Sequence, residues 1–146
     1  LRGGTPIVAD VEMICSGLSR PRLTHFGMKP WQFISDDDVI QAAQAEDTTR
    51  AVQAMRKAHR QGLLDGAIVG IGNAPTALFH LLHMLQDPAC PRPAAIVGCP
   101  VGFVGAAESK DALREWGEIP FAIVQGRLGG SAITVAAINA LATTVE

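Results

Sequence analysis

The stretch with the clearest capacity for binding chemistry is Gly126–Ser131, which reads Gly-Arg-Leu-Gly-Gly-Ser. It follows an apolar run and precedes a segment with helical spacing, so we expect a flexible loop that enters a helix capped by Ser131. The N–H groups at such a helix start, together with the Arg127 guanidinium, can hold a carboxylate or a phosphate. The alternative is an ordinary strand-to-helix turn with a solvated arginine.

Three further arginines point to an anionic ligand. Arg50 directly follows Thr48 and Thr49, either of which can cap the next helix. A cation at a helix start opposes the helix dipole, which suggests that Arg50 is there for a ligand, although a plain surface arginine is the alternative. Arg20 and Arg22 form another basic pair. These arginines together would suit a ligand that bears several carboxylates.

The histidines and cysteines do not define a catalytic or metal centre by their spacing. His80 and His83 are three residues apart on a predicted helix and could form a metal pair, but no acid or thiol at matching spacing supports it. His25 is expected in an irregular segment and is an outside candidate for proton transfer. The cysteines are Cys15, Cys90 and Cys99. An odd, widely spaced set indicates reduced thiols and a cytoplasmic protein, not a disulfide framework or zinc site.

Two glycine-rich segments resemble phosphate-binding loops, but each lacks residues that such a loop requires. Gly70–Pro75 begins like a dinucleotide fingerprint, but a proline stands in place of the third glycine, and no suitable acid follows about 20 residues later. Gly102–Lys110 lacks the Gly-Lys-Ser/Thr of a P-loop. A nucleotide-binding domain is therefore a poor third alternative.

Short apolar runs alternate with longer amphipathic segments. The runs predict strands at 6–9, 67–71, 94–97 and 121–124, with a weaker candidate at 32–34. Helices are expected from a Ser35 cap, from Thr48 or Thr49 to near Gly62, from Pro75 to Leu85, and over 106–116 and 131–141. Runs that are apolar on both faces suit a parallel sheet covered by helices on both sides. Because ligands bind beyond the carboxyl ends of such strands, the loops that follow the apolar runs are the candidate site.

Composition excludes several classes of protein. The net charge of -2 and a pI of about 6.1 disfavour nucleic-acid binding. No apolar stretch approaches the about 20 residues of a membrane span. With 48% hydrophobic and 18% charged residues, and a mean hydropathy of +0.22, part of the surface is expected to be covered by a partner. The start at Leu1, without a methionine, suggests a piece of a longer chain.

Long motifs in series resemble the precorrin-8X methylmutase (precorrin isomerase) family. They are Gly4–Met13, Thr49–Arg50, Gly72–Phe79, Pro100–Lys110 and Gly126–Ala132. The matches run through essentially the whole chain, in the right order, and are far more specific than a single glycine pattern. The resemblance covers the larger, C-terminal part of such an enzyme as one domain, 1–146, lacking the N-terminal segment.

The resemblance implies an α/β fold, a three-layer α/β/α sandwich around a parallel, five-stranded, flavodoxin-like sheet. It implies a homodimer with sites near the subunit interface. It also implies an isomerase of cobalamin biosynthesis that needs no cofactor and moves a methyl group from C11 to C12 of precorrin-8X, giving hydrogenobyrinate or the cobalt-bearing equivalent. The substrate is then a tetrapyrrole polycarboxylate. A non-catalytic corrinoid-binding module is the alternative.

The family's catalytic histidine lies before the first strand, and none of the four histidines here matches its motif, so we assign no catalytic residue and no metal ligand. Arg50 and Arg127 are expected to pair with substrate carboxylates, and Asn73 and Ser131 to donate hydrogen bonds. The full set of expected substrate-binding residues is Ser19, Arg20, Thr49, Arg50, Gly72, Asn73, Arg127 and Ser131.

Overall fold

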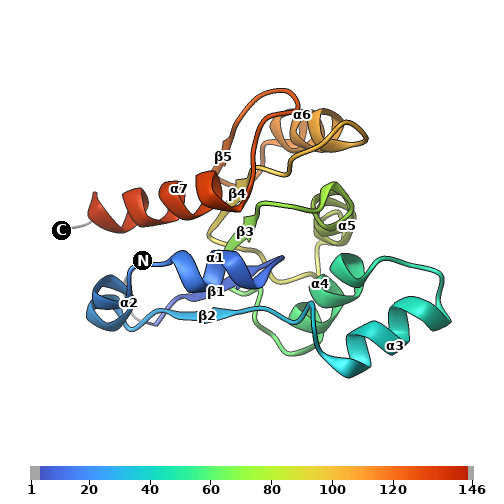
Figure 1. The fold of residues 1–146 in the computed structure, drawn as a ribbon, viewed down its shortest axis with the longest axis horizontal. Helices are drawn as coiled ribbons and strands as arrows, with labels where there is room; N and C mark the ends of the chain where they lie inside the picture. Colours follow the sequence, from blue (N-terminus) through green and yellow to red (C-terminus); the bar gives the residue numbers. More distant parts are fainter. Residues whose placement is uncertain (1–3, 145–146) are drawn as a thin grey trace.

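A computed structural model describes residues 4–144, and its strands form one parallel sheet in the order β2-β1-β3-β4-β5 (Figure 1). The strands are β1 Pro6–Ala9, β2 Lys29–Trp31, β3 Ile68–Ile71, β4 Ala95–Gly98 and β5 Phe121–Ile123. The helices are α1 Glu12–Gly17, α2 Arg20–Phe26, α3 Asp37–Ala45, α4 Arg50–Arg60, α5 Pro75–Leu85, α6 Ala106–Trp116 and α7 Ser131–Thr143. This order is that of a flavodoxin-like sheet, as expected.

Alternation along the strands places apolar side chains on both faces of the sheet. In β1, Val8 packs with α4, α5 and α6, whereas Ile7 and Ala9 pack on the opposite face with α1 and α7. Ile96 and Val97 of β4 divide between the two faces in the same way. Successive strand residues point to opposite sides, so a strand buried on both faces must be apolar throughout. The two helix layers of Figure 1 therefore complete a three-layer α/β/α sandwich.

Local sequence accounts for the helices that begin at the carboxyl edge of the sheet. Thr49 is the N-cap of α4, where its hydroxyl accepts the Val52 N–H at 3.1 Å. Pro75 occupies the first turn of α5, where a missing N–H costs nothing. Leu78 and Leu81 then bury that helix against the sheet. Both helices therefore start near the strand ends, as the sequence predicts.

The second strand was predicted at 32–34, and this was wrong, because pairing with β1 occurs at Lys29–Trp31. The side-chain oxygen of Gln32 accepts the Ile34 N–H at 2.9 Å, which turns the chain away from the sheet. Phe33 is buried against α4 instead of standing in a strand. An apolar run can thus be buried without pairing, which hydropathy alone does not distinguish.

Three local expectations also need correction. The N-cap of α3 is Asp36, not Ser35, and no side chain caps that helix. Ser131 is the first residue of α7 and does not cap it, because Gly130 holds the cap position with a φ of 119°. His25 lies within α2, not in an irregular segment. Among residues 4–144, no helix is long and apolar enough to cross a membrane.

Candidate functional site at the carboxyl edge of the sheet

Asp10, the residue after β1, organises the loop after β3. Its carboxylate is fully buried and accepts backbone N–H groups from Gly72 at 3.0 Å, Asn73 at 2.9 Å and Ala74 at 2.8 Å. Burial raises the pKa of Asp10, and these hydrogen bonds oppose that effect. The loop that carries Gly72 and Asn73 is therefore fixed in place by one carboxylate.

The start of α7 packs directly on this same loop. A Cβ atom on Gly72 would lie 2.8 Å from the Cα of Ser131 and 3.0 Å from its backbone nitrogen. Only a glycine at position 72 permits so close an approach of two backbones. The structure therefore brings together three expected site residues, Gly72, Asn73 and Ser131, from segments about 60 residues apart in sequence.

The loop between β5 and α7 is tied to the loop between β4 and α6. The Gly130 N–H donates to the Cys99 carbonyl at 2.8 Å, and the Gly102 N–H donates to the Arg127 carbonyl at 3.3 Å. Lys110 of α6 adds a third tie by donating to the Leu128 carbonyl at 2.6 Å. The segment expected to be flexible is thus held at three of its residues, Arg127, Leu128 and Gly130.

The side chain of Arg127 extends from this tied loop into solvent. Its guanidinium carbon lies 5.4 Å from the ring centre of Phe103, which is itself 83% exposed. Such a cation–π contact orients a guanidinium without neutralising it. Arg127 is therefore available to an anionic ligand beside an exposed aromatic ring.

Thr49 and Arg50 stand at the same edge, where α4 begins. The Thr49 hydroxyl lies 3.1 Å from that of Thr76 at the start of α5, so the two helix starts touch. Arg50 lines a hollow of about 490 Å³ beside α3, together with Asp47 and Thr48. Arg50 is therefore at the expected edge but borders a hollow on the α3 side.

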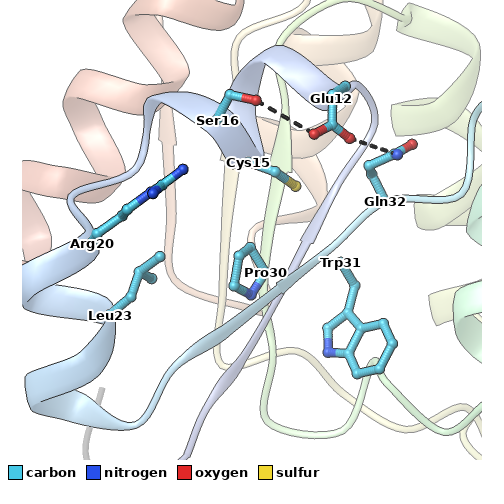
Figure 2. Close-up of a pocket in the computed structure, with 8 residues that line it drawn as sticks. All are labelled: Glu12, Cys15, Ser16, Arg20, Leu23, Pro30, Trp31 and Gln32. Carbon is cyan, nitrogen blue, oxygen red and sulfur yellow. Dashed lines mark hydrogen bonds between the residues drawn. The ribbon is translucent and has the colours of Figure 1, made fainter.

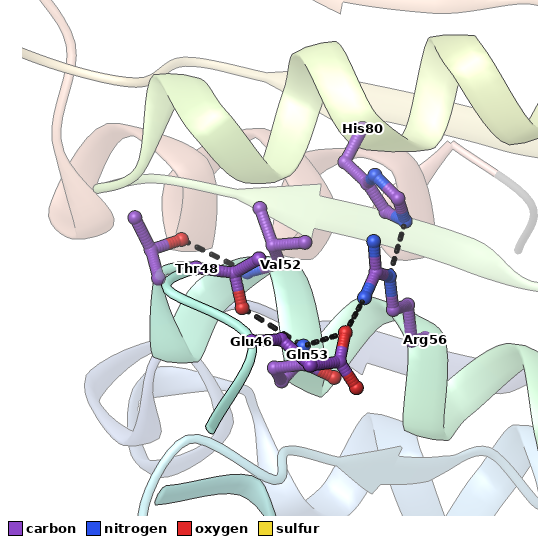
Figure 3. A network of polar contacts seen from close by, with 7 residues as sticks. Glu46, Thr48, Val52, Gln53, Arg56 and His80 are labelled. Carbon is purple, nitrogen blue, oxygen red and sulfur yellow. Dashed lines mark hydrogen bonds and ion pairs between the residues drawn. The ribbon is translucent and has the colours of Figure 1, made fainter. Parts of the chain in front are cut away.

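A polar network supports the turn that presents Thr49 and Arg50 (Figure 3). The amide of the buried Gln53 donates to the Thr48 hydroxyl at 2.8 Å and to Glu46 at 3.1 Å. Arg56 binds Glu46 and donates to Nε2 of His80 at 3.3 Å. Together these contacts tie the turn between α3 and α4 to α4 and α5.

His80 takes part in this network as an acceptor, so its Nε2 carries no proton. Burial and the neighbouring Arg56 charge lower the pKa of His80. The metal pair of His80 and His83 is disfavoured, because Nε2 of His80 already accepts a hydrogen bond. Among the described residues, no three His, Cys, Asp or Glu side chains gather in a way that could hold a metal.

Arg20 lies apart from these loops, in a hollow of about 440 Å³ between α1, α2 and β2 (Figure 2). Glu12, at the upper end of that hollow, accepts hydrogen bonds from Gln32 at 2.6 Å and Ser16 at 3.4 Å. Burial, with help from Glu12, raises the pKa of Cys15 to about 11. The Cys15 thiol is therefore protonated at neutral pH and is no nucleophile there.

Ser19 is also separate from the loop cluster. Its backbone N–H donates to the side-chain oxygen of Asn139 at 2.9 Å. Asn139 is eight residues into α7 from Ser131, which places it about 12 Å further along the helix. Ser19 instead lines a hollow with Arg22 and His25. The structure therefore does not bring the predicted residues Ser19 and Arg20 beside Gly72, Asn73 and Ser131.

Two residues of this edge, Asp10 and Lys110, were not among the predicted substrate-binding residues. Asp10 directly follows an apolar run. An acidic residue just after a predicted strand is a usable signal for a neighbouring loop that is held in place by a carboxylate. Lys110 offered no signal, because a lysine in the middle of a helix usually points to solvent.

Burial raises the pKa of Cys90 and of Cys99 as well, so the described cysteines offer no reactive thiolate. The edge is suited to non-covalent binding of an anionic ligand.

The fold defines an α/β protein of the flavodoxin-like type, and its glycine-rich loops gather at the carboxyl edge of its sheet, where ligands bind in such folds. A family model for precorrin-8X methylmutase, CbiC, matches residues 1–144. The chain belongs to the precorrin-8X methylmutase family, which confirms the resemblance seen in its motifs.

Individual relatives agree with the family assignment. A cobalt-precorrin-8 methylmutase of Leptospira interrogans is 45% identical over an alignment of 146 residues that covers 97% of this chain and 66% of the relative. A precorrin-8X methylmutase of Sinorhizobium sp is 52% identical over an alignment of 144 residues that again covers 97% of this chain and 66% of the relative. A crystal structure of a precorrin-8X methylmutase from Thermus thermophilus has a TM-score of 0.84 and 41% identity, covering 96% of this chain and 66% of that one. This chain thus spans slightly less than two thirds of these relatives.

Proposed function

We propose that the protein is an isomerase of cobalamin biosynthesis that moves a methyl group from C11 to C12 of precorrin-8X or of its cobalt-bearing equivalent. The observation that carries the proposal is the contact of Gly72 with Ser131, which joins the glycine-rich loops at one edge of the sheet. The family and the names of the relatives supply the reaction. A flat ring with many carboxylates suits backbone-lined loops flanked by arginines.

The residues of this edge would bind and orient the ring. Arg127, beside the exposed ring of Phe103, would pair with a substrate carboxylate. Asn73, whose backbone Asp10 holds, would donate a hydrogen bond from its side chain, as would Ser131. Arg50 would meet carboxylates on the α3 side. An acid that protonates the ring would make methyl migration easier, and we assign that role to no histidine of this chain.

We also propose that two copies of the protein associate. Helix α7 is apolar around much of its circumference, and Ile133 and Leu141 on it are 39% and 38% exposed. Phe103 and Leu128 on neighbouring loops are 83% and 72% exposed. Apolar surface of this kind is usually covered by a partner. We further propose that the protein is cytoplasmic, because its three cysteines are all unpaired thiols.

The test is a spectroscopic titration of the chain with hydrogenobyrinate, the coloured product of the proposed reaction. Arg127→Ala and Arg50→Ala are compared with Arg114→Ala, which removes an exposed arginine paired to Asp111 near the end of α6. Loss of a hydrogen bond to a charged partner predicts affinity about 10- to 100-fold weaker for Arg127→Ala. Arg114→Ala should bind like the unmodified chain.

The outcomes separate the parts of the proposal. Unchanged affinity in both Arg127→Ala and Arg50→Ala would mean that the pocket is misplaced. If the product of the complete gene binds hydrogenobyrinate but never converts precorrin-8X, the non-catalytic corrinoid-binding module is correct. Failure of that complete product to bind any corrinoid would overturn the proposed function itself.

A further inference from the structure

Lys110 is an unusual residue for the middle of a helix, because its side chain is fully buried, with 0% of its surface exposed. Lysine is rarely buried so completely unless a carboxylate pairs with it. None of the ion pairs between residues 4 and 144 includes Lys110. The hydrogen bond that its Nζ makes there goes to a backbone carbonyl, that of Leu128, at 2.6 Å.

The acceptor belongs to the loop that presents the predicted anion-binding groups. Leu128 stands between Arg127 and the two glycines that lead into α7. The same loop packs closely on the residue after β4, because a Cβ atom on Gly129 would lie only 2.2 Å from the Cys99 carbonyl oxygen. Lys110 therefore fastens the loop from the side of α6, at the residue next to Arg127.

The charge of Lys110 is also poorly compensated. Burial lowers the pKa of Lys110, while Cys99 and Asp111 act in the opposite direction. A neutral apolar residue of similar length would fill the space without this desolvation cost. The desolvation cost of Lys110 is explained if its ammonium group fixes a loop that binds anions. The positive charge behind that loop also favours anion binding.

We propose that Lys110 is a positioning residue that, through the Leu128 carbonyl, sets the loop from which Arg127 and the first N–H groups of α7 meet carboxylates of the ligand. The identity of the ligand rests on the function proposed above. The fixing of the loop does not rest on it and can be measured without ligand.

The central variant is Lys110→Met, which keeps the length of the side chain and removes both donor and charge. Its matched control is Leu113→Ala on the same helix, a change that opens a cavity in the core and leaves the Lys110–Leu128 contact intact. Limited trypsin digestion of the ligand-free chain reports on the bond between Arg127 and Leu128, both of which are exposed. Titration with hydrogenobyrinate reports on binding.

Lys110→Met should be cleaved after Arg127 about tenfold faster than the unmodified chain, as expected from loss of a hydrogen bond to a charged group. Cleavage after Arg50, which is exposed at the start of α4, should be unchanged. Hydrogenobyrinate should bind about tenfold more weakly. In Leu113→Ala, cleavage at all sites should change together with global stability. Under conditions in which Leu113→Ala is fully folded, its affinity for hydrogenobyrinate should equal that of the unmodified chain.

The idea is overturned if Lys110→Met is cleaved after Arg127 no faster than Leu113→Ala is, or if it binds the product normally. Should Lys110→Met fail to fold, Lys110→Gln retains a donor of shorter reach, and the same two comparisons decide. If the unmodified chain and the complete gene product both fail to bind hydrogenobyrinate, the proposed function is wrong. The trypsin result still determines whether Lys110 holds the loop.

Discussion

The carboxylate of Asp10 accepts the backbone N–H of Asn73 at 2.9 Å, although the two residues are 63 positions apart in sequence. Asp10 directly follows β1 and Asn73 lies in the loop after β3, and these strands are neighbours in the sheet. Chain connections leave β1 and β3 toward opposite edges of the sheet, which is the arrangement at which open α/β sheets bind ligands. The Asp10 carboxylate lies at this point and holds the loop that follows β3.

Replacing Asp10 by asparagine should weaken both stability and binding. An amide presents one acceptor oxygen, so its NH₂ group must face at least one of the three N–H donors. We expect the free energy of unfolding to fall by about 2 to 3 kcal/mol. Urea denaturation followed by circular dichroism measures the change. Asp87→Asn is the control, because Asp87 also accepts a backbone N–H, from Ala89, but in an exposed turn, and it should cost clearly less.

The ionisation of Asp10 gives a second, independent prediction. Because burial raises its pKa above the ordinary 3.8, the folded protein binds this proton more tightly than the unfolded chain does. The contribution of Asp10 to stability is thus fully present below pH 3.8 and is lost as the pH rises through the folded-state pKa. Carbon NMR of the Asp10 carboxyl group should give a midpoint above 3.8. A midpoint below 3.8 would mean that the three N–H donors outweigh burial.

Gly72→Ala should damage the site far more than Gly70→Ala. At position 72 the added methyl would meet the backbone of Ser131 at 2.8 Å, which cannot move unless α7 shifts. At position 70 it would meet the flexible tip of Ile138 at 3.0 Å. Overpacking against backbone predicts a loss of about 1 to 3 kcal/mol for Gly72→Ala, with weaker hydrogenobyrinate binding. Equal effects of the two variants on affinity would argue against a binding role for the Gly72–Ser131 contact.

Composition and periodicity predicted the central strands well for a physical reason. A strand buried on both faces must be apolar throughout, and β1, β3 and β4 lie within about one residue of their predicted limits. The edge strand β2 lacks that constraint. It contains Pro30, whose missing N–H is tolerated where no further strand pairs. The sequence prediction instead placed this strand on the apolar run at 32–34.

The site was partly predictable for a related reason. Gly72, Asn73 and Ser131 follow strand ends or begin a helix, so topology places them at one edge. Ser19 does not follow a strand, and its position beside Asn139 depends on how α1 and α2 pack. The role of Lys110 depends on a contact with Leu128 across 18 residues of sequence. Contacts of that kind are decided by packing, which no local pattern records.

Cys15 should react slowly with iodoacetamide at neutral pH. Burial raises its pKa to about 11, and the negative charge of Glu12 adds to the effect. The alkylation rate of Cys15, followed by mass spectrometry of its peptide, should therefore keep rising with pH toward about 11. Glu12→Gln should shift that profile to lower pH. An unshifted profile in Glu12→Gln would show that burial alone determines the pKa of this thiol.

His80 should make the protein lose stability in mild acid. Its pKa is lowered by burial and by Arg56, so the unfolded chain takes up a proton first as the pH falls below the ordinary 6.5. Stability is then present above pH 6.5 and is lost as the pH falls through the lower folded-state value. His80→Gln, which keeps an acceptor for Arg56, should reduce the difference between urea midpoints at about pH 7.5 and about pH 5.5. The variant His83→Gln leaves the Arg56–His80 hydrogen bond in place and should retain most of that difference, because His83 is the smallest of the three causes that lower the pKa of His80. If His80→Gln retains it as well, the acid sensitivity has another origin, and the neutral state of His80 is not what stabilises this network.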